Sequence, residues 1–334
     1  LLLGRVYYEK GQSSKALTEF NLVLERFRQT DLASGAAYWV AEVYFAGGNY
    51  EQALSYYQKV IDSYPTSRFA QYAHYSQAWC YEKLGEYDEA VDLFSEVVRL
   101  YPHDELAVKA HYKSAEILYD TREFRKAAEE LLSFTEKYPV SEQIFEAYYM
   151  LGDCYYKLNR YDEAIVELER SLRRGGDSPW RAVAQYKIGK CYLEVNDTAS
   201  AAVWFEKAME DADDPATKSA ALMGIASICL DEGDREGALR AYNEVITELP
   251  ENEWTDDAYY WLGDALYKGG SMDNSIRIYT EALEKYPRGE FAAEMRYNLG
   301  WAYLGAGEDQ KALEEFDRTI EISDDADLVA SALC

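Results

Sequence analysis

The most constraining feature of this sequence is an internal repeat with a period of 37 residues. One alanine recurs at this interval, at Ala16, Ala53, Ala90, Ala127, Ala164, Ala201 and Ala238, and after Ser275 again at Ala312. A second alanine series begins at Ala36, and a glycine or asparagine series begins at Gly11, both with the same period and without an insertion. Three series in step indicate a chain built from stacked copies of one small supersecondary unit.

Each repeat carries the pattern of two amphipathic helices. In the second repeat, apolar residues recur every three or four positions from Ala37 to Tyr44 and again from Tyr50 to Ile61. The glycine or asparagine series, from which only Arg122 departs, falls between the two stripes and suits the left-handed residue that ends a helix. All seven prolines lie at repeat junctions, where the residue before a proline leaves helical geometry. The pattern predicts helix–turn–helix units and no strand.

These residues resemble the tetratricopeptide repeat family, whose pattern is W-x2-L-G-x2-Y, then A-x3-F and then P. The matching segments are Leu151-Gly152-x2-Tyr155 with Ala164-x3-Leu168, and Leu299-Gly300-x2-Tyr303 with Ala312-x3-Phe316. Two departures are visible: the tryptophan is replaced, for example by Tyr148, and the period is 37 rather than 34 residues. The longer unit, with junctions such as Tyr64-Pro65, is similar to bacterial envelope members, such as the outer-membrane assembly lipoprotein and the Tol-Pal-associated cell-division coordinator.

The resemblance implies an all-α fold, a right-handed superhelical solenoid of nine helix–turn–helix units. No unit can bury its apolar stripe alone, so we expect one continuous domain over residues 1–334. The predicted units are 1–33, 34–70, 71–107, 108–144, 145–181, 182–218, 219–255, 256–292 and 293–329, with the start of a tenth at 330–334. Neither end has the polar cap that solenoids need, so we expect a fragment of a longer solenoid. The junctions 174–182 and 210–216 lose the regular Tyr-Pro, which predicts either altered curvature or simple loop drift.

Catalytic and ligand-binding motifs are not found. The sequence has no phosphate-binding, dinucleotide-binding or H-E-x-x-H motif, so we expect no enzyme activity, cofactor or metal. His74 and His111 share one repeat position, which favours packing over ligation. The acidic run 210–214 lacks the spacing of a calcium loop and is interpreted as a solvated junction. The internal cysteines, Cys80, Cys154, Cys191 and Cys229, are interpreted as small buried packing residues without disulfides.

The net charge limits the classes of partner. With 34 lysines and arginines against 61 aspartates and glutamates, the chain has a formal charge of −27. This charge repels phosphate, so we expect no binding to nucleic acid or to anionic membranes. There is also no apolar run long enough to insert into a membrane. Carboxylates such as Glu42, Glu116 and Asp153 at expected groove positions argue for a basic or an aromatic and apolar partner segment rather than an acidic one.

A ladder of aromatic residues marks the expected binding surface. Repeat position five is tyrosine in seven units, and on a first helix it lies away from the stripe that meets the second helix, hence toward the concave groove. Tyrosine is enriched at binding hot spots. The candidate partner-binding residues at positions five, nine and twelve are Tyr38, Tyr75, Trp79, Tyr112, Tyr119, Tyr149, Tyr156, Tyr186, Tyr260, Tyr267, Tyr297 and Trp301. We expect the contact to centre on Tyr112 to Tyr186; alternatively, the rings only support the stack.

Three functions fit these features. The first is a non-catalytic scaffold that binds a partner protein or peptide along the groove, as the resemblance implies. The second is a structural or spacer element of a larger envelope machine, with self-assembly through open solenoid ends. The third is an accessory domain of an enzyme that lies outside this sequence. The resemblance to envelope proteins favours the periplasm or cell envelope, whereas unpaired cysteines favour a reducing compartment.

Overall fold

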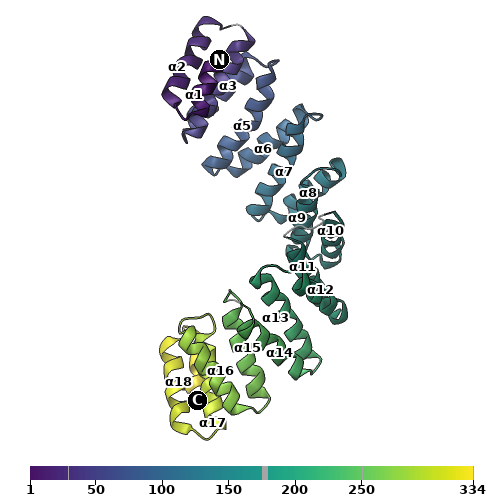
Figure 1. Cartoon of the computed structure of the whole chain (residues 1–334), viewed down its shortest axis with the longest axis vertical. Coiled ribbons are helices and arrows are strands. Elements are labelled where there is room, and N and C mark those ends of the chain that lie inside the picture. Colours follow the sequence, from purple (N-terminus) through teal and green to yellow (C-terminus); the bar gives the residue numbers. More distant parts are fainter. Residues whose placement is uncertain (29, 175–179, 250, 334) are drawn as a thin grey trace. The chain divides into compact units, whose positions relative to one another are not determined.

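Every regular element of the described residues, 1–28, 30–174, 180–249 and 251–333, is an α-helix in the computed structural model (Figure 1). The predicted all-α class is therefore confirmed. The helices group into two units, Leu1–Arg160 and Tyr161–Cys334, each compact in itself. The expected single continuous solenoid, with its right-handed superhelix, concerns how these units join and stays a prediction.

The first unit contains helices α1 to α9. Their bounds are α1 Leu2–Glu9, α2 Ser13–Arg26, α3 Asp31–Ala46, α4 Tyr50–Ser63, α5 Arg68–Leu84, α6 Tyr87–Leu100, α7 Glu105–Asp120, α8 Phe124–Lys137 and α9 Ile144–Lys157. Each helix packs against the next one along the chain, and α3, α5, α7 and α9 also contact one another in succession. The odd-numbered first helices thus form a layer of their own, as stacked helical repeats require.

The second unit repeats this arrangement. Its helices are α10 Tyr161–Arg174, α11 Arg181–Glu194, α12 Thr198–Asp211, α13 Pro215–Asp231, α14 Arg235–Thr247, α15 Thr255–Lys268, α16 Met272–Lys285, α17 Ala292–Gly305, α18 Asp309–Ile322 and α19 Ala326–Leu333. Contacts between first helices join α11 to α13, α15 to α17, and α17 to α19. The helix–turn–helix units predicted from the repeat are therefore present in both halves.

The turns within the repeats adopt the predicted left-handed backbone. Glycines of the series have φ near +70 to +80°, for example +80° at Gly85. Arg122, which departs from the glycine or asparagine series, has φ of 64° and follows the same path despite its Cβ. Among the described prolines, Pro215 differs from the rest because it is the first residue of α13, where its missing N–H costs no hydrogen bond.

Small residues at repeat position eight, such as Gly189 and Gly263, let the two helices of one repeat approach closely. A Cβ added to Gly263 would lie 2.4 Å from the Tyr279 ring of the second helix. The Phe205 ring lies between two glycines, and a Cβ on either Gly189 or Gly224 would come within 2.7 Å of it. Close packing of this kind leaves no room for an added methyl group, so these positions fix the helix spacing.

The predicted irregular junctions fall partly outside the described residues. Within 174–182, residues 175–179 are not described. Within 210–216, α12 ends at Asp211, and Asp214 caps α13 by accepting a 2.8 Å hydrogen bond from the Thr217 amide. Asp211 accepts hydrogen bonds from Arg181 at 2.8 Å and Gln185 at 2.7 Å. Two carboxylates of the acidic run thus have structural roles.

Candidate partner-binding surface

The position-five tyrosines are half-buried wedges between helices. The Tyr75 ring lies 5.5 Å from Phe94 on the second helix of its own repeat, and Tyr38 lies 5.7 Å from Tyr57 in the same way. The expectation that position five points away from the second helix was therefore wrong in part. The ring is long enough to contact the second helix. Part of it still stays exposed, since every position-five tyrosine is only partly buried. Its role in binding stays a prediction.

Position-five residues of α7 and α9 are also partly buried. The Tyr112 ring packs 5.6 Å from Phe134, and its hydroxyl lies 3.7 Å from the Met150 sulfur on α9. Burial raises the pKa of Tyr149, with a further contribution from the nearby Asp153 carboxylate. Tyr156, at position twelve of α9, is half-buried, with the Lys157 ammonium 5.8 Å from its ring centre. Packing and partial exposure thus coexist in the predicted centre of the ladder.

The carboxylates of this surface in the first unit have donors within the chain. Glu42 accepts a 2.6 Å hydrogen bond from the Tyr57 hydroxyl and a 3.3 Å bond from Ser76. Asp153, only 1% exposed, accepts a 2.6 Å bond from the Tyr119 hydroxyl. One acceptor position of each carboxylate is therefore already occupied within the chain, and the neutral hydroxyl donors leave the negative charge in place.

A lysine bridges a tryptophan and two carboxylates between α5 and α7. The Lys113 ammonium lies 4.7 Å from the centre of the Trp79 ring, close enough for a cation–π interaction. The same ammonium is 2.7 Å from Glu116 and 3.2 Å from Glu82. With Lys83, whose ammonium lies 3.1 Å from Glu82, two cations balance two carboxylates on this part of the surface.

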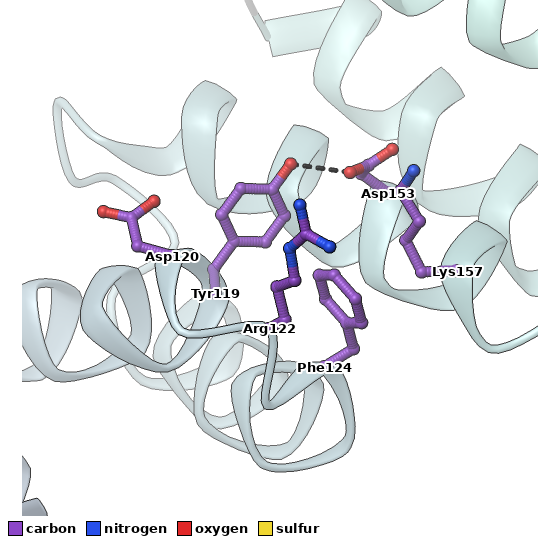
Figure 2. A pocket seen from close by; sticks show the side chains of 6 residues that line it. All are labelled: Tyr119, Asp120, Arg122, Phe124, Asp153 and Lys157. Atoms are coloured by element: carbon purple, nitrogen blue, oxygen red, sulfur yellow. Dashed lines mark hydrogen bonds between the residues drawn. The ribbon is translucent and has the colours of Figure 1, made fainter.

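A pocket of about 350 Å³ opens where α7 and α9 end (Figure 2). Its lining residues are Tyr119, Asp120, Arg122, Phe124, Asp153 and Lys157. Figure 2 shows the Tyr119 hydroxyl pointing at the Asp153 carboxylate, with Asp120 on the opposite side of the Tyr119 ring. Burial raises the pKa of Asp120, with help from the Glu116 charge. The pocket combines an aromatic wall with charges of both signs at its rim.

An equivalent pocket of about 290 Å³ lies two repeats earlier, between α3 and α5. It is lined by Glu42, Phe45, Tyr57, Ser76, Trp79 and Lys83. Phe45 and Tyr119 share repeat position twelve, and Lys83 and Lys157 share position thirteen. The first helices of this unit thus offer the same kind of pocket at two places, two repeats apart. We call positions two, five, six, nine, twelve and thirteen of the first helices the first-helix face.

In the second unit, the predicted aromatic residues also pack onto neighbours. Tyr186 lies 5.7 Å from Phe205, Tyr297 lies 5.8 Å from Phe316, and Tyr260 stacks on Phe291 at 4.6 Å. Tyr267 is half-buried and Trp301 is 39% exposed. The structure thus places all twelve predicted residues on first helices, in two groups that belong to separate units.

Sequence reasoning missed three features of the first-helix face. Trp261, at position six of α15, is 38% exposed. Lys83 and Lys157 add cations at position thirteen. Position thirteen could have been found, because it lies one helical turn after position nine on the same face.

Histidines and cysteines occupy packing positions. His111 is buried, with its Nε2 3.0 Å from Glu130 and its ring 5.7 Å from Phe134. Cys80, Cys154 and Cys191 are buried and Cys229 is half-buried. Within the part of the chain that the structure describes, no three His, Cys, Asp or Glu side chains gather to hold a metal ion. No described helix is both long and apolar enough to span a bilayer.

The repeat architecture matches a known family. The family model described as tetratricopeptide repeat matches residues 32–103, 143–214 and 254–325, more than half of the sequence. The chain belongs to the tetratricopeptide repeat family. The helix pairs, the left-handed turns and the contacts between successive first helices are those of this family. A second model, described as an outer membrane lipoprotein, matches residues 75–162.

Solved structures of tetratricopeptide repeat proteins have the same fold. The C-terminal part of a protein from Cytophaga hutchinsonii superposes with a TM-score of 0.60 at 14% identity, over 77% of this chain and 98% of that one. A protein from Parabacteroides merdae gives 0.52 at 16% identity, over 79% and 97%. The Naa15/Naa10 structure bound to HypK-THB gives 0.56 at 16% identity, over 99% of this chain and 53% of that one. No curated protein sequence matches the chain.

Proposed function

We propose that this tetratricopeptide repeat chain is a non-catalytic scaffold that binds a partner protein or peptide on its first-helix face. The observation that carries this proposal is the recurrence of the aromatic-walled pocket at α3–α5 and at α7–α9. Two such pockets, roughly 20 Å apart when successive first helices pack about 10 Å apart, suit side chains about six residues apart on an extended segment, which rises about 3.3 Å per residue. The fold neighbour Naa15/Naa10, which is bound to HypK-THB, also supports a binding role.

The first unit favours an aromatic or apolar segment over a basic one. Its carboxylates Glu42 and Asp153 are engaged by tyrosine hydroxyls, and Glu116 is paired with Lys113. What remains open to a ligand is the ring surface of the pockets and a few lysines at the rim. Burying apolar side chains against such rings contributes about 25 cal/mol per Å² of area removed from water.

We further infer a location in the bacterial cell envelope. The match of residues 75–162 to the outer membrane lipoprotein model supports it. That match covers α6 to α9 almost entirely, which is the region that holds the pocket of Figure 2. A fractionation experiment with the full-length protein in its own cells tests this location, and recovery in the cytosol alone would contradict it.

The binding proposal is tested by peptide selection on the full chain followed by fluorescence anisotropy. Alanine at Tyr112, Tyr149 or Tyr156 should weaken the selected peptide by roughly 1–3 kcal/mol each, as hot-spot residues do. Leu132→Ala is the matched control, since Leu132 is 37% exposed on the second helix α8. Thermal melts accompany each variant because the tyrosines are half-buried. A large fall in melting temperature with unchanged peptide affinity would show that the ladder is only structural.

A further inference from the structure

The two units differ strongly in charge. Residues 161–334 contain 17 lysines and arginines against 37 aspartates and glutamates, a formal charge of −20, whereas residues 1–160 contain 17 against 24, a charge of −7. The second unit therefore carries most of the negative field of the protein. Such a field attracts cationic partners and repels acidic ones.

An exposed tryptophan stands on the first-helix face of this acidic unit. Trp261 of α15 is 38% exposed, and its ring lies 5.0 Å from Tyr260 in an edge-on arrangement. Tyr260 is itself stacked on Phe291 at 4.6 Å, and burial raises its pKa. The tryptophan thus rests on a fixed aromatic base. No described lysine or arginine lies over the Trp261 ring, so its face is open to a cation from elsewhere.

Carboxylates without cationic partners lie beside this aromatic group, since the charge of Glu294 acts on Tyr260 and that of Glu290 acts on Asp257. Asp257 precedes Trp261 by four residues on α15, which places both on one side of the helix. Asp256, Asp257, Glu290 and Glu294 form no ion pair within the described residues. Burial, together with the charges of Asp256 and Glu290, raises the pKa of Asp257 to about 6. The neighbouring carboxylates repel one another, and a cation bound beside them would reduce this repulsion.

The first unit contains an internal example of the missing interaction. There, Lys113 lies over Trp79 at 4.7 Å and pairs with Glu116 at 2.7 Å. On α15 the same kinds of group, a tryptophan and carboxylates, are present without the lysine. The chain itself therefore shows how an ammonium group sits between an indole ring and acidic side chains.

We propose that the surface formed by Asp257, Tyr260, Trp261 and Glu294 binds a lysine- or arginine-rich segment of a partner protein. This inference rests on the proposed scaffold function and extends it, because it assigns a basic partner segment to the second unit. One cationic side chain stacks on Trp261 and pairs with Asp257, and flanking cations pair with Glu290 and Glu294. The first unit, whose carboxylates are already engaged, takes the apolar segment instead.

The test measures anisotropy of fluorescein-labelled peptides on the full chain at 150 mM salt. The probe is a twelve-residue repeat of Lys-Gly-Leu, and its counterpart has glutamate in place of lysine. Trp261→Ala should weaken binding of the basic probe about 5- to 30-fold, the range of a desolvated cation–π contact, and Trp261→Phe should weaken it less. Asp257→Asn should weaken it further without loss of helix. The matched control is Tyr87→Ala with Glu89→Gln, which also removes one exposed ring and one carboxylate but from the second helix α6, and it should leave affinity unchanged.

Three results would overturn this inference. The first is equal affinity of the wild type and the Trp261→Ala protein for the basic probe. The second is equal weakening by the control pair in the first unit, which would indicate diffuse attraction to a −27 chain. The third is equally tight binding of the glutamate probe. Each of these leaves the proposed scaffold function standing, since that function fails only when no selected peptide depends on Tyr112, Tyr149 or Tyr156.

Discussion

Removing the Tyr119 hydroxyl tests whether this residue supports the stack or the ligand. In Tyr119→Phe the ring stays on the wall of the pocket, but the 2.6 Å hydrogen bond to Asp153 is lost. That bond joins α7 to α9 and therefore links two successive repeats. Asp153 is 1% exposed, so water cannot easily replace the lost donor.

The expected cost follows from the charge and burial of the acceptor. A hydrogen bond to a charged group contributes about 1.5–3 kcal/mol, so the loss in Tyr119→Phe should fall in this range. In an Asp153→Asn background the acceptor is neutral, and Tyr119→Phe should then cost only about 0.5–1.5 kcal/mol. The difference between the two backgrounds reports the charge-assisted part of the bond.

Tyr112→Phe is the matched control, because the Tyr112 hydroxyl also bridges α7 and α9. Its acceptor is the Met150 sulfur at 3.7 Å, which is a weak one, so we expect a loss below about 0.5 kcal/mol. Hydrogen exchange of amides in α7 and α9 measures the local stability, since repeat arrays open locally. Equal losses in Tyr119→Phe and Tyr112→Phe would refute the reasoning. Peptide affinity should fall in Tyr119→Ala and not in Tyr119→Phe, because Asp153 already occupies the hydroxyl.

Three further predictions follow from packing and from pKa values. Gly189→Ala should lower thermal stability by about 1–3 kcal/mol, because the new Cβ would lie 2.7 Å from Phe205, and Phe205→Leu should restore part of the loss. The pKa of Asp257 rises from 3.8 to about 6 on folding, so its contribution to stability is fully present below pH 3.8 and is lost as pH rises through about 6. Urea titrations at several pH values should therefore show the free energy of unfolding falling between these limits. The Asp257→Asn protein should lack this fall. Cys229, half-buried, should react with a thiol reagent in the native protein, whereas buried Cys154, whose pKa burial raises to about 12, should react only after unfolding.

The fold could be predicted from the sequence because every repeat carries the same residue types at the positions that determine its turns and close helix contacts. The turn at Asn159 and the close approach at Gly263 each follow from one residue type at one repeat position. An exception such as Arg122 does not matter, since eight other turns fix the path and the neighbouring repeats impose it. Repetition therefore averages out local departures that would mislead the prediction of a single domain.

The packing of the candidate surface could be predicted only in outline. Helical periodicity placed Tyr75 on the right helix, but it could not show that the ring reaches Phe94 on the second helix. Whether a side chain reaches the next helix depends on the distance between the helices. The small residues at position eight set this distance, and the spacing of residues in the sequence does not give it. The pairing of Glu42 with Tyr57 was hidden for the same reason, because it depends on side-chain rotamers rather than on register.

Variation on a constant frame explains how one repeat could recognise different partners. Position nine carries Trp79 in one repeat and Asp153 in another, and position six carries Lys113 in one repeat and Trp261 in another. The backbone frame keeps these positions on the same face, so exchanging residue types between them changes the ligand chemistry without changing the fold. In the first unit the exchange places Lys113 over Trp79 and pairs it with Glu82 and Glu116. Around Trp261 the lysine is missing and the carboxylates remain, so recognition there requires the cation to come from a partner.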